Sequence, residues 1–155
     1  MKNCIIALLH YCIIGAATLH AQVVTTNQPA APDTPVADAT ARSRASEFAE
    51  GITRDGYTLR DGVVLHDIDS TRPIFIEVNL FAGNYYWFCA ATPVPTDKLS
   101  ITVLDEKKRP LDTLKYASGS TVAAGITPKS TGRYFVRIAL EGGEKTRVCF
   151  LYLYK

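Results

Sequence analysis

Apolar and polar residues alternate with a period of two along several short segments of this chain. In the first of them, four aliphatic side chains from Ile74 to Leu80 share one face. This period is typical of strands that bury one face. The alternation covers residues 74–81, 99–103, 134–140 and 148–154. Residues 85–91 are apolar on both faces, which predicts a strand in the middle of a sheet.

Short strands separated by Gly and Pro turns, with no long helix among them, predict an all-β fold. We expect an antiparallel, two-sheet β-sandwich of the jelly-roll-like kind over residues 51–155, about the size of one domain with one core. Asp61-Gly62 between two apolar runs predicts an opening hairpin. Tyr134, just after Gly132, is placed to return its hydroxyl to nearby backbone and fix a sandwich corner. The expected core is Ile76, Val78, Trp87, Ile101, Val103, Val136, Ile138 and Phe150.

Residues 1–21 have the pattern of a signal peptide. Lys2 is followed by an apolar run over residues 4–14 and then by small residues. Cleavage is expected after Ala21, with Ala17 as the alternative. The apolar run is about half the roughly 20 residues that a membrane-spanning helix needs. We therefore expect no membrane insertion after cleavage, and a product exported to the periplasm or outside the cell.

Residues 22–50 are rich in Ala, Thr and Pro and poor in large apolar side chains. Such a composition buries too little surface to offset the entropy of ordering, so it predicts a flexible, disordered spacer. The alternative is an unused leader left after processing. A short helix is predicted within it over residues 42–50, with Phe48 as its one large anchor.

The charge balance and the scarcity of histidine argue against several functions. The chain has 17 basic and 15 acidic residues, and loss of Lys2 with the signal leaves a net charge of +1, which indicates no nucleic-acid partner. His66 is the one histidine outside the signal. Residues next to each other on a strand point to opposite faces of the sheet, so the sequence neighbours of His66 rarely form a catalytic geometry with it. We therefore expect no catalytic residues and no enzyme activity.

Two smaller sites are suggested by residue type. Asp67-x-Asp69 is a weak calcium candidate, since calcium takes oxygen ligands, and surface acids otherwise serve solubility. No other cofactor is expected. Cys89 and Cys149 are the two cysteines outside the signal, and export predicts a disulfide between them. The alternative is a pair of buried free thiols.

The order of these features resembles the bacterial pre-peptidase C-terminal domain, a jelly-roll-like sandwich appended to exported proteins. The matching segments are HDID at 66–69, AGNY at 82–85, LSITVLD at 99–105 and TGRYFVRI at 131–138. The resemblance implies an accessory or binding role. Two features depart from it: no peptidase domain precedes the sandwich, and the turn after Asp105 lacks the glycine that the family often has.

The function expected from the sequence is an exported, noncatalytic binding or assembly module. It would present loops or a sheet face to a glycan, peptide or envelope partner, with Tyr85, Tyr86, Tyr152 and Tyr154 as the candidate binding surface. Core packing is the competing interpretation for at least half of these tyrosines. The alternative function is a small secreted hydrolase or enzyme inhibitor.

Overall fold

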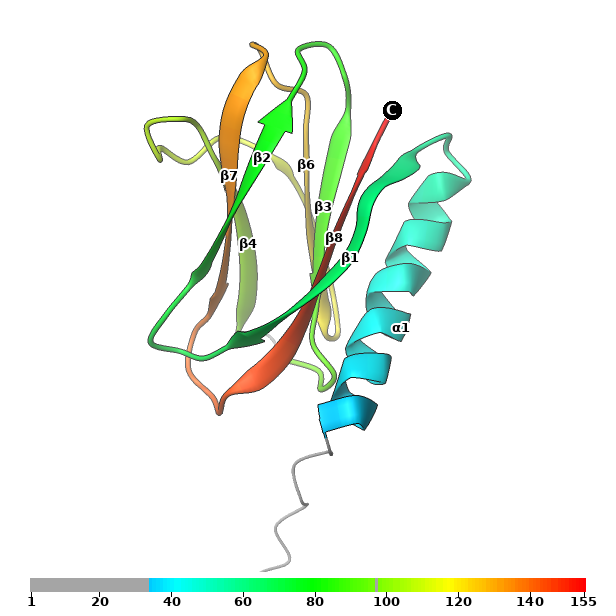
Figure 1. Ribbon diagram of the computed structural model, residues 1–155, viewed down its shortest axis with the longest axis vertical. Helices are drawn as coiled ribbons and strands as arrows, with labels where there is room; N and C mark the ends of the chain where they lie inside the picture. Colours follow the sequence, from blue (N-terminus) through cyan, green and yellow to red (C-terminus); the bar gives the residue numbers. More distant parts are fainter. Residues whose placement is uncertain (1–33, 97) are drawn as a thin grey trace, which may run out of the picture. The chain divides into compact units, whose positions relative to one another are not determined.

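The computed structural model describes residues 34–96 and 98–155. One helix and eight strands follow one another along this part of the chain (Figure 1). They are α1 (Thr34–Thr53), β1 (Thr58–Ile68), β2 (Ile74–Leu80), β3 (Tyr86–Ala91), β4 (Leu99–Leu104), β5 (Leu114–Ser118), β6 (Thr121–Ile126), β7 (Gly132–Leu140) and β8 (Thr146–Tyr154). The predicted signal peptide and residues 22–33 of the predicted spacer lie outside the described residues.

The strands form two antiparallel sheets, as predicted, but the described chain is mostly β and not all-β, because helix α1 precedes the strands. One sheet has five strands in the order β1-β8-β3-β6-β5, and the other has three in the order β2-β7-β4. From β1 to β4 the chain crosses to the opposite sheet at each step. Each sheet therefore contains neighbours that are distant in sequence, as in β1 against β8 and β2 against β7.

The main core lies between the two sheets. Five of the eight predicted core residues are buried there, and Ile76 and Ile101 pack against them. The prediction for Trp87 was wrong, because this side chain lies on the opposite face of β3 and packs in a second apolar cluster with residues of α1. The five buried residues are Val78, Val103, Val136, Ile138 and Phe150.

Helix α1 covers the outer face of the five-stranded sheet and runs along β1 and β8 (Figure 1). Ala41 and Ala45 are fully buried there, and Phe48 and Ile52 continue the same helical stripe. The facing strands present small residues, among them Cys89 and Ala123, so the helix packs closely on the sheet. The short helix predicted over 42–50 is therefore longer and begins at Thr34, and Ala37 and Ala41 of the predicted spacer are buried.

Polar contacts also join α1 to the strands. Arg147 at the start of β8 binds Asp38 of α1, with 2.6 Å between Nε and Oδ1, and binds Asp67 of β1 at 2.8 Å. Arg44 of α1 donates hydrogen bonds to the Ser120 hydroxyl and to the Thr92 carbonyl. Within the described residues, no helix is both long and apolar enough to cross a membrane.

The predicted hairpin at Asp61-Gly62 was wrong, although both residues adopt the positive φ that the pattern indicates, 58° and 76°. Strand β1 continues through them as a bulge. Arg60 lies opposite Tyr152 and Val64 opposite Phe150, so β1 has two more residues than β8 over this interval. The bulge is stabilised by the Tyr152 hydroxyl, which donates to the Asp61 carboxylate at 2.7 Å.

The predicted corner at Tyr134 is confirmed. Its hydroxyl donates a hydrogen bond to the Ser130 carbonyl at 2.8 Å, across the turn that leads into β7. This contact fixes the point at which the chain enters the three-stranded sheet.

Candidate functional site

A hollow of about 410 Å³ lies at one end of the five-stranded sheet, beside the start of β3, the start of β5 and the end of β6. We call it the aromatic groove. Its walls combine aromatic rings, one exposed leucine and several polar groups. It is lined by Tyr57, Tyr85, Tyr86, Trp87, Asp112, Thr113, Leu114, Gly125, Ile126 and Thr127.

The strand register places Trp87 beside two other lining residues of this groove. Gly125 lies opposite it on β6, and Leu114 lies opposite Gly125 on β5. A Cβ at residue 125 would lie 2.9 Å from the indole ring, so the absence of a side chain there lets the ring lie over the β6 backbone. Phe48 of α1 meets the ring edge to face, with 5.9 Å between centroids.

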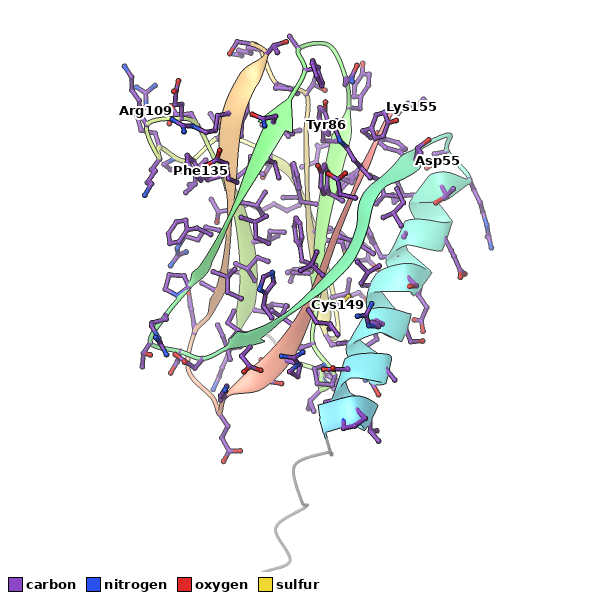
Figure 2. The ribbon with its side chains drawn as sticks, in the orientation of Figure 1. Asp55, Tyr86, Arg109, Phe135, Cys149 and Lys155 are labelled. Atoms are coloured by element: carbon purple, nitrogen blue, oxygen red, sulfur yellow. The ribbon has the colours of Figure 1, made fainter. Side chains whose placement is uncertain are left out.

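Tyr85 and Tyr57 also line the groove. Tyr85 is 54% exposed, while its backbone exchanges two hydrogen bonds of 2.9 Å with Lys155. The Lys155 ammonium lies 5.7 Å from the centroid of the Tyr57 ring and donates to the Asp55 carbonyl at 2.7 Å. Figure 2 shows Lys155 and Asp55 together at this end of the domain. Lys155 thus contacts both tyrosines, Tyr85 through its backbone and Tyr57 through its ammonium group, while the Tyr85 ring stays exposed to solvent.

The polar groups of the groove can form directional contacts beside these rings. Asp112 is exposed and supplies carboxylate oxygens, and Thr113 and Thr127 supply hydroxyls. Binding sites for small ligands usually combine apolar and aromatic walls with a few such polar groups. The lining residues include no histidine or cysteine.

The predicted tyrosine surface does not form a single exposed patch. Tyr86 and Tyr152 point into the core and are 1% and 7% exposed, and Tyr154 packs against the same core. The Tyr86 hydroxyl accepts a hydrogen bond from the Phe81 amide at 2.9 Å. Burial raises the pKa of Tyr152 to about 12, and the hydrogen bond with Asp61 adds to this. Only Tyr85 of the four presents its ring to solvent at the groove.

The two carboxylates of the calcium candidate have other partners. Asp67 binds Lys145 and Arg147, each at 2.8 Å, and these cations hold its pKa below the ordinary value. Asp69 accepts hydrogen bonds from the backbone and hydroxyl of Thr71, which lower its pKa in the same direction. Within residues 34–96 and 98–155, no three His, Cys, Asp or Glu side chains are grouped as metal ligands.

Cys89 and Cys149 are buried, unbonded thiols, so the predicted disulfide is absent from the structure. Cys89 lies opposite Leu151 and Cys149 lies opposite Ala91, which makes the cysteines diagonal neighbours on β3 and β8. Diagonal side chains lie about 7 Å apart, whereas a disulfide needs Cβ atoms about 4 Å apart. Burial raises the pKa of both thiols, that of Cys149 to about 11. Cys149 faces α1 (Figure 2).

A second hollow, of about 850 Å³, lies at the other end of β3. The loop between β3 and β4 and the turn between β7 and β8 line it, together with Ala37 of α1. The charges on one wall are already paired, since Asp67 binds Lys145 and Arg147 also binds Asp38. These residues fasten the beginning of α1 to β8, which gives this wall a structural role.

The outer face of the three-stranded sheet carries further aromatic residues. The Lys108 ammonium lies 5.7 Å from the Phe75 ring centroid and 5.6 Å from that of Phe135. Phe75 is about half exposed. None of these three residues lines either of the hollows described above. Substitutions on this face can therefore serve as controls for substitutions in the groove.

Comparison with known proteins adds no relative: no family model and no curated protein matches this chain. The aromatic groove was found only in part from sequence. Tyr85 and Tyr86 belong to the surface predicted from sequence, whereas Tyr57, Trp87 and Leu114 were not assigned to a surface. The one available signal was Gly125 in an apolar run, because a glycine within a strand often marks the close approach of another group.

Proposed function

We propose that this chain is an exported, noncatalytic binding module that holds a carbohydrate in the aromatic groove. The observation that carries the proposal is the fixed placement of Trp87 and Tyr85 in a hollow that also contains Asp112. The C–H faces of a sugar pack on aromatic rings, and its hydroxyls donate to a carboxylate.

The signal-like pattern of residues 1–21 supports export, and the composition of residues 22–33 supports a tether between the signal and the domain. In this proposal the described domain is displayed in the periplasm or outside the cell, where polysaccharides are available. A noncatalytic module there would raise the local concentration of whatever it is joined to or assembled with.

The winding of the chain supports a jelly-roll-like sandwich related to the pre-peptidase C-terminal domain. The strands alternate between the sheets from β1 to β4, and β7 and β8 return between earlier strands. The segments that carry the resemblance coincide with the end of β1, the turn before β3, strand β4 and the start of β7. Domains with this winding include many lectins, which agrees with a carbohydrate ligand.

The alternative of a small secreted hydrolase or inhibitor gains no support from particular residues. The aromatic groove has no pair of nucleophile and base, and His66 lies on β1 opposite Val148, outside the groove. We therefore treat binding without catalysis as the function to test first.

The test is titration of the intact chain with cellohexaose, chitohexaose, laminarihexaose and mannohexaose, followed by Trp87 fluorescence and calorimetry. At least one sugar is expected to bind and to change the emission of Trp87, the only tryptophan. Tyr85→Ala is expected to weaken that binding at least about tenfold, equivalent to about 1.4 kcal/mol. Phe75→Ala removes a similarly exposed aromatic outside the groove and should leave affinity unchanged.

Absence of binding to all four sugars at millimolar concentration contradicts the carbohydrate proposal. If Tyr85→Ala and Phe75→Ala lose the same amount of sugar affinity, the ligand binds elsewhere on the molecule.

A further inference from the structure

Strand β5 forms an edge of the five-stranded sheet, and all five of its residues are exposed. Leu114 is 69% exposed and Tyr116 is also exposed, so the edge has apolar side chains beside its backbone. On the side away from β6, no backbone group of the described residues pairs with β5. Such an edge is a template for another strand unless something protects it.

The other three edges have features that obstruct strand addition. Strand β1 is interrupted by the bulge at Asp61-Gly62. Strand β4 continues into a bridge from Leu104 to Pro110. Strand β2 begins directly after Pro73 and carries the charge of Glu77 on its exposed face. Bulges, prolines and charges are the usual protections of sheet edges, and β5 contains no proline and one lysine.

The hydrogen-bond pattern identifies which β5 groups face outward. The backbones of Tyr85 and Lys155 exchange two hydrogen bonds. In an antiparallel sheet the backbone groups of successive residues point to opposite sides of the strand, so every second residue of β3, counted from Tyr85, bonds to β8 and the residues between them bond to β6. The same alternation applies to β6, which pairs with β3 on one side and with β5 on the other. The β5 residues opposite the β6 groups that point away from β3 are Leu114, Tyr116 and Ser118, so their backbone groups bond to β6. The N–H and C=O groups of Lys115 and Ala117 therefore point away from the sheet.

We propose that β5 pairs antiparallel with β5 of a second copy of this chain, about a two-fold axis at Tyr116. Lys115 of one copy then lies opposite Ala117 of the other, and both are the outward-facing residues that must exchange hydrogen bonds. The two five-stranded sheets become one sheet of ten strands. Closed two-fold pairing of this kind is the commonest form of protein self-association.

The side chains of β5 favour a second copy over an unrelated strand. The axis places Tyr116 against its own counterpart and Leu114 against Ser118, and Lys115 meets Ala117, so no like charges face each other. Helix α1 makes its contacts chiefly with β8, β3 and β1. It reaches β5 through Phe48, whose ring centroid lies 5.1 Å from that of Tyr116, and no hydrogen bond of the described residues joins the helix to the β5 backbone. Since Leu114 also lines the aromatic groove, the pairing would place the grooves of both copies close to the β5–β5 interface.

Sedimentation velocity of the intact chain, over a range reaching about 100 μM, tests the pairing, because strand-mediated dimers of this size usually dissociate in the micromolar range. The parent is expected to dimerise reversibly. Ala117→Pro removes an outward N–H that β6 does not use, so the monomer should fold normally and its dimerisation should weaken at least tenfold. Circular dichroism and thermal unfolding check that the variant folds.

Cysteine cross-linking tests the register independently. Tyr116→Cys places two thiols directly opposite each other, about 4.5 Å apart between Cα atoms in a non-hydrogen-bonded pair, and should form an intermolecular disulfide under mild oxidation. Lys115→Cys is the matched control on the same strand. In the proposed register residue 115 lies opposite Ala117 of the second copy, so the two introduced thiols would not face each other. A parent that stays monomeric at about 100 μM, or equal cross-linking of the two variants, overturns the proposal. Neither result depends on whether the groove binds a carbohydrate.

Discussion

The indole ring of Trp87 lies over the backbone of Gly125 on the neighbouring strand, so close that a Cβ at residue 125 would be 2.9 Å from two ring atoms. Phe48 and the sheet hold the ring in place, which leaves it little freedom to move. Gly125→Ala is therefore expected to lower the free energy of unfolding by about 1 to 3 kcal/mol. Urea unfolding and the native emission spectrum of Trp87 measure the effect.

The matched control is Gly132→Ala at the start of β7. A Cβ there has no heavy atom within 4 Å. Its stability should stay within about 0.5 kcal/mol of the parent, the usual range of surface changes. If both variants lose the same stability, contact with Trp87 is not the cause.

The packing of α1 on the sheet gives a second prediction. Ala41 is fully buried, whereas Ala39 is exposed on the opposite side of the same helix. Ala41→Leu should cost about 1 to 3 kcal/mol, because the added atoms have no space against β3 and β8. Ala39→Leu should be close to neutral. Urea unfolding gives the values, and limited proteolysis should cut α1 faster in the Ala41 variant alone; a neutral Ala41→Leu would mean that the helix is not docked as described.

The Asp67 carboxylate should contribute stability that depends on pH. Lys145 and Arg147 lower its pKa from 3.8 in the folded state. Stability gained from a lowered acid pKa is fully present above the unfolded pKa and is lost as pH falls through the folded value. The stability difference between the parent and Asp67→Asn should thus be constant near neutral pH and shrink below about pH 4.

Because Asp67 is half exposed, this difference should be small, at most about 1 kcal/mol, and should fall with added salt. Denaturant unfolding at several pH values provides the measurement. A difference that grows on acidification would contradict the assigned ion pairs.

The Tyr134 hydroxyl donates a hydrogen bond to the Ser130 carbonyl and lies 3.3 Å from the Ser130 hydroxyl. Tyr134→Phe removes this hydrogen bond while keeping the ring, and the expected loss is about 0.5 to 1.5 kcal/mol. Tyr116→Phe, which removes an exposed hydroxyl, should be neutral by the same unfolding assay. A neutral result at both sites would show that the corner contributes nothing to stability.

The two cysteines should react as buried free thiols. In native protein, alkylation of Cys89 and Cys149 should be slow, because both are buried and the pKa of Cys149 is raised to about 11. In denaturant without reductant, mass analysis should find both residues alkylated. Finding neither alkylated until a reductant is added would mean that the protein contains the disulfide after all.

The local patterns of the sequence determined most of the strands. Alternation located β2, β4, β7 and β8, and the all-apolar run located β3, because these patterns record directly which faces are buried. The corner at Tyr134 and the positive φ at Asp61-Gly62 also follow from local chemistry. Strands β5 and β6 were not predicted. All residues of β5, Leu114–Ser118, are exposed, so the strand shows no alternation of buried and exposed positions. In β6, Ala123-Ala124-Gly125 has little intrinsic preference for strand.

The tertiary structure decided what each of these elements does. Positive φ suits both a hairpin and a bulge, and only the pairing of β1 with β8 selected the bulge. Alanines at α1 seemed too small to bury useful area until the small residues of β3, β6 and β8 gave them a close surface. The aromatic groove depends on Trp87, Gly125 and Leu114, which are far apart in sequence and meet only through strand register. Sequence patterns report the neighbours that a residue has along the chain, whereas a binding site is made of neighbours that folding brings together.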